Sequence, residues 1–136
     1  MKLNNLKVLV VDDYQKMRQG LCATLKPLDL NISEASNGVE ALKALRQDKF
    51  DVVFTDLVMP EMDGFELCEE IRKTPEWADM PIVVISTHYD SRYIVKALRQ
   101  GADDYIPKPV EPETVKRVLD RILTPTILRE NHEQNN

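Results

Sequence analysis

The sequence predicts an α/β fold: a doubly wound, five-stranded parallel sheet with helices on both faces. Five short runs rich in β-branched residues alternate along the chain with segments whose apolar residues recur at helical spacing. The run Ile82–Ile85 contains no polar residue, which is typical of a strand that is covered on both sides. A length of 136 residues fits one such domain.

The first third of the chain predicts two strands and two helices. A buried strand is expected over Leu6–Val11, and the helix after it is marked by Met17, Leu21, Leu25 and Leu28. Leu30–Ala35 alternates in polarity and predicts a weaker second strand. The sequence Ser36-Asn37-Gly38 then starts a helix, and the apolar residues on one side of it are Val39, Leu42 and Leu45.

The remaining elements follow in the same alternation. A third strand is expected over Asp51–Thr55, and the next helix is marked by Phe65, Cys68 and Ile71. After the fourth strand, Ile82–Ile85, comes a helix with Ile94, Ala97 and Leu98 that ends at Gly101. Asp104–Ile106 is a short fifth strand. Pro112 suits the first turn of a last helix, whose buried stripe is Val115, Val118, Leu119 and Ile122. We expect residues 1–124 to form the domain and the polar residues 125–136 to form a frayed tail.

Composition excludes several classes of protein. The net charge is −5 and no basic block exceeds two residues, so there is no cationic footprint for nucleic acid. No apolar run approaches the roughly 18 residues of a membrane span, and the first residues do not resemble a secretory signal. The two cysteines, Cys22 and Cys68, lie far apart and are expected to be reduced thiols. We expect a cytoplasmic protein that binds neither membranes nor nucleic acid.

Polar residues directly follow four of the expected strands, and these are Asp12, Asp13, Asp56, Ser86, Thr87 and Lys108. In open α/β sheets the ligand site lies beyond the carboxyl ends of the strands, so these side chains should converge. Each one alone also has a local explanation. Asp12 or Asp13 could cap a helix, Asp56 could belong to a turn, Ser86 could bond locally, and Lys108 could be a solvated charge.

Three carboxylates at one place repel one another, and one would stay protonated unless a cation neutralised them. A hard divalent ion with oxygen ligands, most simply Mg²⁺, removes this conflict and leaves Asp56 ionised. Ser86 and Lys108 would then offer a donor and a positive charge to an anion with several oxygens. A phosphoryl group is such an anion.

Four segments resemble the receiver domains of two-component response regulators. They are Leu9-Val10-Val11-Asp12-Asp13, Thr55-Asp56-Leu57-Val58-Met59-Pro60-Glu61-Met62-Asp63-Gly64-Phe65, Ile85-Ser86, and Gly101-Ala102-Asp103-Asp104-Tyr105-Ile106-Pro107-Lys108-Pro109. The resemblance runs from about residue 5 to 123. It implies a flavodoxin-like fold with the strand order 2-1-3-4-5.

The resemblance also implies a role for each matched residue. Asp56 would accept a phosphoryl group from a phosphohistidine, and Asp12, Asp13, Asp56 and the backbone carbonyl of Val58 would hold Mg²⁺. Ser86 matches the switch hydroxyl, and Thr87 follows it. Lys108 would contact the phosphoryl oxygens, with a cis bond to Pro109. Tyr105 matches the aromatic residue that turns inward when the hydroxyl moves.

The implied function is a phosphorylation-dependent switch rather than an enzyme. Its phosphodonor would be a sensor histidine kinase or a histidine phosphotransfer protein. Few residues follow the last helix, so we expect output through a protein partner and not through a DNA-binding domain. The surface expected to change comprises the fourth helix, fifth strand and fifth helix, with Arg92, Lys96, Arg99 and Tyr105 as contacts. A monomer or weak homodimer is expected.

Two positions depart from the usual receiver pattern. Thr87 stands where the family usually has Ala or Gly, and Val58 is the second residue after Asp56. We expect both side chains to hinder the hydrolytic water, so that the acyl phosphate is long-lived. His88 lies near the same path and could instead guide the water.

Two other classes of protein share parts of this pattern. A Mg²⁺-dependent hydrolase of the haloacid dehalogenase kind also uses a phosphoaspartate, but it needs a second Asp two residues after the nucleophile, where this chain has Val58. A flavodoxin-like cofactor binder shares the fold, but the hydroxyl-rich phosphate loop after the first strand is missing here. A phosphatase assay and the absence of flavin colour would discriminate these readings.

Overall fold

Five parallel strands form one sheet in the computed structural model, which describes residues 5–88 and 90–134, with the backbone alone from 124 onward. The strands are β1 (Lys7–Val11), β2 (Asn31–Ala35), β3 (Val52–Thr55), β4 (Ile82–Ser86) and β5 (Asp104–Pro107). Their spatial order is β2-β1-β3-β4-β5, and every neighbouring pair is parallel. The sheet predicted from the sequence is confirmed, with strand ends that agree to within one residue.

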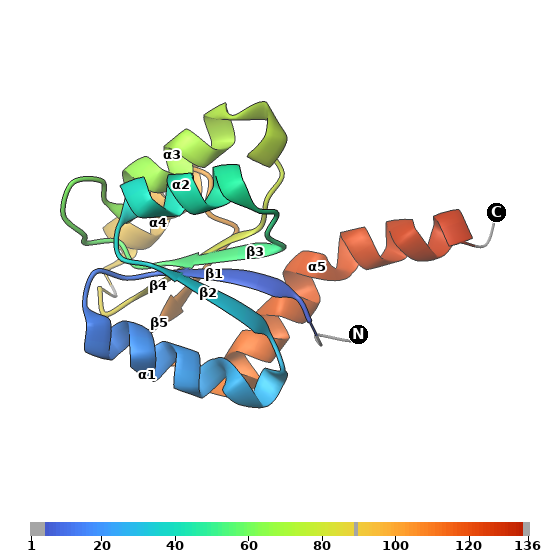
Figure 1. Cartoon of the computed structure of the whole chain (residues 1–136), viewed down its shortest axis with the longest axis horizontal. Helices are drawn as coiled ribbons and strands as arrows, with labels where there is room; N and C mark the ends of the chain where they lie inside the picture. The colour runs from blue at the N-terminus through green and yellow to red at the C-terminus, as the bar shows by residue number, and fades with distance from the viewer. Residues whose placement is uncertain (1–4, 89, 135–136) are drawn as a thin grey trace.

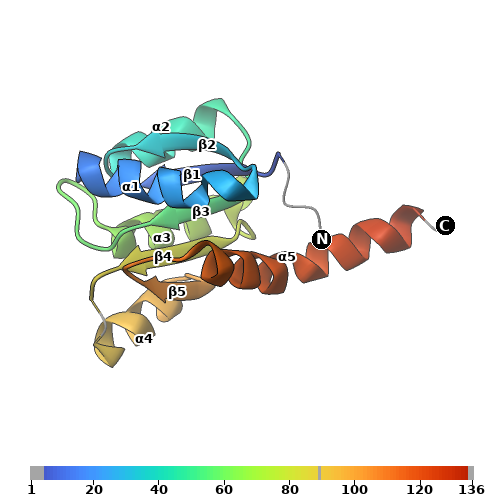
Figure 2. The same ribbon diagram turned by 90° about the horizontal axis from the view of Figure 1, so that it is seen from below.

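Helices cover both faces of this sheet, as the alternating pattern predicts (Figures 1 and 2). They are α1 (Gln15–Leu25), α2 (Gly38–Gln47), α3 (Gly64–Lys73), α4 (Ser91–Arg99) and α5 (Pro112–Gln134), with short 3₁₀ turns η1 (Lys26–Leu28) and η2 (Pro75–Trp77). Helices α1 and α5 pack on one face, and α2, α3 and α4 pack on the other.

Each face of the sheet contributes to its own hydrophobic core. In β1, Leu9 and Val11 face α2 and α3, whereas Val8 and Val10 face α1 and α5. Successive residues of a strand point to opposite faces, so a strand between two cores must be apolar at every position. This requirement explains why the β1 and β4 sequences are nearly continuous apolar runs.

Short polar side chains set the starts of three helices. The side chain of Asn37 accepts a hydrogen bond from the Glu40 amide, and that of Asp63 accepts one from the Glu66 amide, both at 2.8 Å. Asp90 accepts a bond from the Arg92 amide in the same way. Such caps satisfy amide groups that have no partner within the helix. Helix α1 has no side-chain cap at its start.

Three of the apolar residues that mark the predicted helices are exposed: Met17, Val39 and Leu98. Val39 and Leu98 directly follow the buried Gly38 and Ala97. One residue further is about 100° round the helix, so these two side chains leave the face that packs on the sheet. Met17 lies in the first turn of α1, at the end of the helix that adjoins the carboxyl edge of the sheet.

Helix α5 is longer than its apolar stripe predicts, because it continues to Gln134. Residues 125–134, which we expected to fray, continue the helix away from the sheet (Figure 1). Their composition suits either state, since Glu, Gln and Arg are polar and also favour helix. A polar sequence therefore does not distinguish an exposed helix from an irregular tail.

The end of α3 is tied to the segment between α4 and β5 by Arg72. Its guanidinium donates to the carbonyl oxygens of Gly101 and Met80, each at 2.7 Å, and forms an ion pair with Asp103 at 3.0 Å. Asp103 also accepts from the Ile82 amide at 2.8 Å. Gly101 has φ +115°, and a Cβ added there would lie 2.5 Å from the Arg72 side chain. This clamp sets where α4 ends and β5 begins.

Neither cysteine is paired. Cys68 is buried and Cys22 is half-buried. Burial raises the pKa of the Cys68 thiol to about 12, so it stays protonated at neutral pH. No helix in the described ranges, 5–88 and 90–134, has the length and apolar character needed to cross a bilayer.

Candidate functional site

Three carboxylates converge at the carboxyl edge of the sheet. Asp12 and Asp13 follow β1, and Asp56 follows the neighbouring strand β3. Oxygen atoms of all three side chains lie within 4.8 Å of one another. The convergence predicted from strand ends is therefore confirmed for these residues.

Asp12 is held at every polar atom. It is only 2% exposed. Its Oδ1 accepts a hydrogen bond from the Tyr14 amide at 3.0 Å, and its Oδ2 accepts one from the Lys108 ammonium at 2.9 Å. The backbone amide of Asp12 donates to Ala35 in β2 at 3.1 Å. Asp12 is thus a fixed part of the site, although it is not the side-chain cap of α1.

Asp13 is the opposite case. Its side chain is exposed and makes no hydrogen bond or ion pair within the part of the chain that the structure describes. Both of its oxygens are therefore open to a ligand. The acidic pair consists of one engaged carboxylate and one open carboxylate.

Asp56 and Asp12 are bridged by Lys108. The Lys108 ammonium lies 3.2 Å from Asp56 Oδ2 and 2.9 Å from Asp12 Oδ2, and the lysine is only 8% exposed. Burial lowers the pKa of Lys108, but the hydrogen bond to Asp12 and the negative charges of Asp56 and Asp12 outweigh it and raise the pKa above its usual value. A solvated surface charge, the local explanation for this lysine, is wrong.

The charges of this cluster do not balance. Asp12, Asp13 and Asp56 lie together and only Lys108 pairs with them among the described residues, through Asp12 and Asp56, so the cluster has a formal charge of −2. Hard divalent ions prefer carboxylate oxygens as ligands, and the open oxygens of Asp13 are available to one. The residues present therefore fit Mg²⁺.

Ser86 ends β4, the strand next to β3, and is fully buried. Its hydroxyl oxygen accepts a hydrogen bond from the His88 amide at 3.2 Å. Thr87 points to solvent. Among the described contacts, Ser86 does not touch the carboxylates, so the structure places this hydroxyl at the correct edge but not against Asp56.

Tyr105 connects β5 to the segment after β4. Its ring is half-buried, and its hydroxyl donates to the backbone carbonyl of His88. The Lys108–Pro109 peptide bond is cis, as the resemblance implies. The residues that the sequence assigns to the switch thus occupy neighbouring strands β4 and β5.

The positive residues expected on α4 differ in whether their side chains are free to contact a protein partner. Arg92 forms an ion pair with Asp90 at 2.8 Å, and the Lys96 ammonium lies 4.4 Å from the centre of the Phe65 ring. Arg99 is exposed and has no partner within the described residues. Sequence reasoning missed the exposed apolar residues beside them, Tyr93, Val95 and Leu98. The signal was a run of apolar residues too wide for one buried face.

The loop after Asp56 requires a glycine at its end. The Gly64 amide donates to the Leu57 carbonyl at 2.8 Å, and a Cβ at Gly64 would lie 2.1 Å from the backbone oxygen of Asp56. The loop can therefore return to the start of α3 directly beneath the acidic site. Val58 lies in this loop and is 58% exposed.

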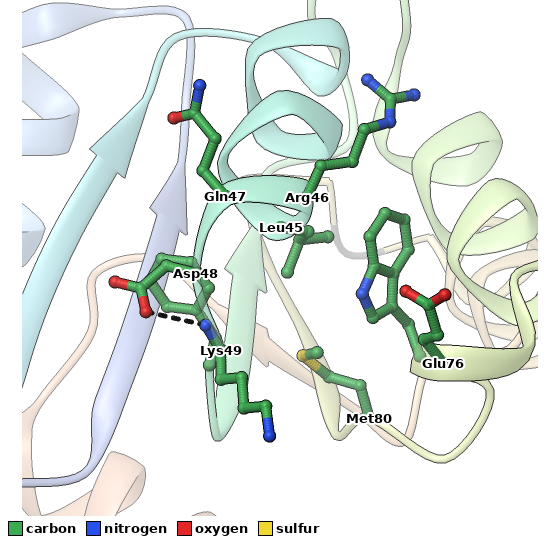
Figure 3. A pocket seen from close by; sticks show the side chains of 9 residues that line it. Leu45, Arg46, Gln47, Asp48, Lys49, Glu76 and Met80 are labelled. Atoms are coloured by element: carbon green, nitrogen blue, oxygen red, sulfur yellow. Dashed lines mark hydrogen bonds between the residues drawn. The ribbon is translucent and has the colours of Figure 1, made fainter.

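A groove lies at the opposite, amino-terminal edge of the sheet. It has a volume of about 820 Å³ and lies between the end of α2 and η2 (Figure 3). Leu45, Phe50, Trp77 and Met80 line it together with charged residues. None of the acidic-site residues lines this groove, so it is separate from the candidate site.

Comparisons with known proteins agree on one family. Residues 8–120 match the family model described as response regulator receiver domain. The chain is 37% identical over 119 residues to the chemotaxis protein CheY-3 of Vibrio cholerae, and it is 38% identical over 120 residues to the CheY homolog of Campylobacter jejuni. Both alignments cover 87% of this chain and 92% of the relative. It is also 34% identical to the two-component response regulator ARR10 of Arabidopsis thaliana, of which it spans only 23%.

Solved structures give the same result. The chemotaxis protein CheY4 of Vibrio cholerae superimposes with a TM-score of 0.81 at 33% identity, covering 88% of this chain and 99% of that one. The receiver domain of the Francisella response regulator 1452 gives 0.79 at 28% identity, covering 90% and 99%. This chain belongs to the response regulator receiver domain family of two-component signalling.

Proposed function

We propose that this chain is a phosphorylation-dependent switch that accepts a phosphoryl group on Asp56 from a phosphohistidine. The observation that carries the proposal is the acidic cluster: an open Asp13, an Asp56 within 4.8 Å of it, and Lys108 bridging Asp56 to Asp12. Phosphorylation and Mg²⁺ binding are typical of receiver domains, which act as phosphoacceptor switches rather than as classical enzymes.

The transfer asks the protein for position and charge. The P–N bond of the donor breaks, its electron pair returns to the imidazole nitrogen, and a P–O bond to Asp56 forms. Lys108 is already hydrogen-bonded to Asp56 and would offset charge on the phosphoryl oxygens. Asp13 and Asp56, with Asp12 and the Val58 carbonyl, would hold Mg²⁺, which would neutralise further phosphoryl charge when bound.

The product adds nearly two negative charges beside Asp12 and Asp13. The Ser86 hydroxyl, now bonded to the His88 amide, would turn to the phosphoryl group, and Tyr105 would fill the space that it leaves. The surface of α4, β5 and α5 would change as a result. This is a shift between two packings, so its extent is limited by how differently the two states contact the phosphoryl group.

The partners follow from this scheme. The phosphodonor would be a sensor histidine kinase or a histidine phosphotransfer protein, in the cytoplasm. The downstream target would be a protein that recognises Arg99, Lys96 and Tyr105, with Arg92 available once its bond to Asp90 opens. The exposed Val95 and Leu98 add apolar area to that contact. As a monomer or weak homodimer, the chain would present this surface without an obligate partner.

Intact-mass analysis after incubation with Mg²⁺ and acetyl phosphate tests the acceptor. The wild type should gain one phosphoryl group. Asp56→Asn should gain none, because its neutral amide lacks the negatively charged carboxylate oxygen that attacks phosphorus. Asp79→Asn is the matched control, since Asp79 is exposed and has no partner among the described residues. Equal labelling of wild type and Asp56→Asn would refute the assignment.

A further inference from the structure

Arg18 contacts the backbone of the acidic site at Asp12, and it is not among the residues that the sequence assigns to the site. It is the fourth residue of α1, and only 16% of its side chain is exposed. Side chains on a helix lean toward its N-terminus, so the guanidinium of residue 18 reaches back over the loop that carries the acidic pair. The sequence shows only an arginine five residues after Asp13.

The guanidinium joins that loop to β2. Nη1 of Arg18 donates to the backbone oxygen of Asp12 at 2.8 Å, and Nε donates to Glu34 Oε1 at 2.9 Å. Two different nitrogens are used, so the planar fork of an arginine meets both acceptors in one orientation. Lysine has a single nitrogen and cannot reproduce this geometry.

The oxygen that Arg18 holds belongs to the peptide between Asp12 and Asp13. The amide of Asp12 is itself held by Ala35 of β2 at 3.1 Å. The backbone is thus tied to β2 on both sides of Asp12. The Asp13 carboxylate has no partner of its own within the described residues, so the backbone is what fixes the position and direction of the Cα–Cβ bond from which the carboxylate extends.

We propose that Arg18 is a positioning residue for the Mg²⁺ site: it orients the Asp12–Asp13 peptide and thereby places the Asp13 carboxylate. The proposal rests on the proposed function, since it concerns the same acidic site. Residues that orient metal ligands from outside typically change metal affinity by about 10–100-fold when they are replaced.

The charge of Arg18 has the opposite effect. A cation next to an acidic cluster repels a metal ion, so its removal should strengthen Mg²⁺ binding if charge were its only role. Positioning and charge therefore predict changes of opposite sign, and affinity measurements can separate them.

The test is calorimetric titration of Mg²⁺ into the full chain, below the unfolding temperature of every variant. We expect Arg18→Gln and Arg18→Lys both to bind Mg²⁺ on the order of tenfold more weakly than the wild type. Phosphorylation by acetyl phosphate should recover at saturating Mg²⁺, because affinity is impaired and the chemistry is not. Arg46→Gln, which removes an exposed cation at the other edge of the sheet, should bind normally.

Unchanged or tighter binding by Arg18→Gln would overturn the proposal, as would wild-type affinity in Arg18→Lys. Circular dichroism establishes the folded fraction, and if Arg18→Gln does not fold, Arg18→Lys decides the question. A wild type that binds no Mg²⁺ would instead refute the proposed function. The two failures are therefore distinguishable.

Discussion

At the residue scale, Lys108 defines how the acidic site works before any ligand arrives. It contacts both Asp12 and Asp56, whereas Asp13 has no such contact in the described chain. The raised pKa of Lys108 keeps the ammonium charged up to strongly alkaline pH. Its stabilising contribution is complete below the pKa of an unfolded lysine and is lost only as pH rises through the higher folded value. The site therefore keeps its cation across the neutral range.

We expect the lifetime of the proposed acyl phosphate to depend on Val58 and Thr87, both of which are exposed. We expect Val58→Asn combined with Thr87→Ala to shorten it on the order of tenfold, because a polar side chain and a smaller one give water an oriented approach. Phosphate release after removal of the donor measures the decay. Val95→Asn makes the same valine replacement on the exposed side of α4 and should leave the decay rate unchanged. Equal decay in the double variant and the wild type would contradict the expectation.

Single residues could be predicted where a local pattern specifies them. Asp12, Asp13, Asp56 and Lys108 directly follow strands, and parallel strands bring their carboxyl ends to one edge. Arg18 could not be found in this way, because its role depends on which backbone oxygen a long side chain reaches. The distance from Ser86 to Asp56 depends on side-chain orientation, which strand order does not determine.

At the element scale, glycines decide where two helices begin and end. Gly64 lets the loop from Asp56 pass close to its own backbone before α3, and Gly101 ends α4 in a left-handed conformation against Arg72. Gly20 is different, because it lies within α1 with no atom near the position of an added Cβ. Glycine is therefore required by close contacts at Gly64 and Gly101, whereas at Gly20 no neighbouring atom requires it.

We expect Gly101→Ala to lower the free energy of unfolding by about 1–3 kcal/mol, since alanine is strained at φ +115° and would contact Arg72. Gly20→Ala should raise it by about 0.5–1 kcal/mol, because alanine favours helix and meets open space. Urea unfolding measures both changes. A neutral Gly101→Ala would mean that the Arg72 clamp adjusts without cost.

Element types and order were predictable, but helix faces less so. Periodicity placed all five helices, but three of the apolar residues that mark them, Met17, Val39 and Leu98, are exposed. Whether an apolar residue at the margin of a helical stripe is covered depends on how the helix sits on the sheet. That docking is a property of several elements together and is absent from any one segment.

At the scale of the whole molecule, Leu123 lies in the core beside α1 and is the last residue of α5 whose side chain the structure describes. The sequence predicts that the domain ends at residue 124, so a chain of residues 1–124 should keep the thermal unfolding midpoint of the full chain and its proposed phosphoryl acceptance. Ending at residue 118 removes buried Leu119 and Leu123 and should unfold the domain or cost at least about 2–5 kcal/mol. Calorimetry with intact-mass analysis measures both properties. Loss of folding in the longer fragment would make the helical extension part of the domain.

The Arg72 clamp has a mechanical consequence for α4. Four carbonyl groups and one carboxylate meet a single guanidinium near the C-terminal end of this helix, whereas its first turn follows the segment that carries Ser86 and His88. With its C-terminal end held by Arg72, helix α4 would move mainly by rotating about that end. Displacement produced by phosphorylation would then be greatest near Arg92 and smallest near Arg99, so a target could sense the angle of α4 by binding both ends at once.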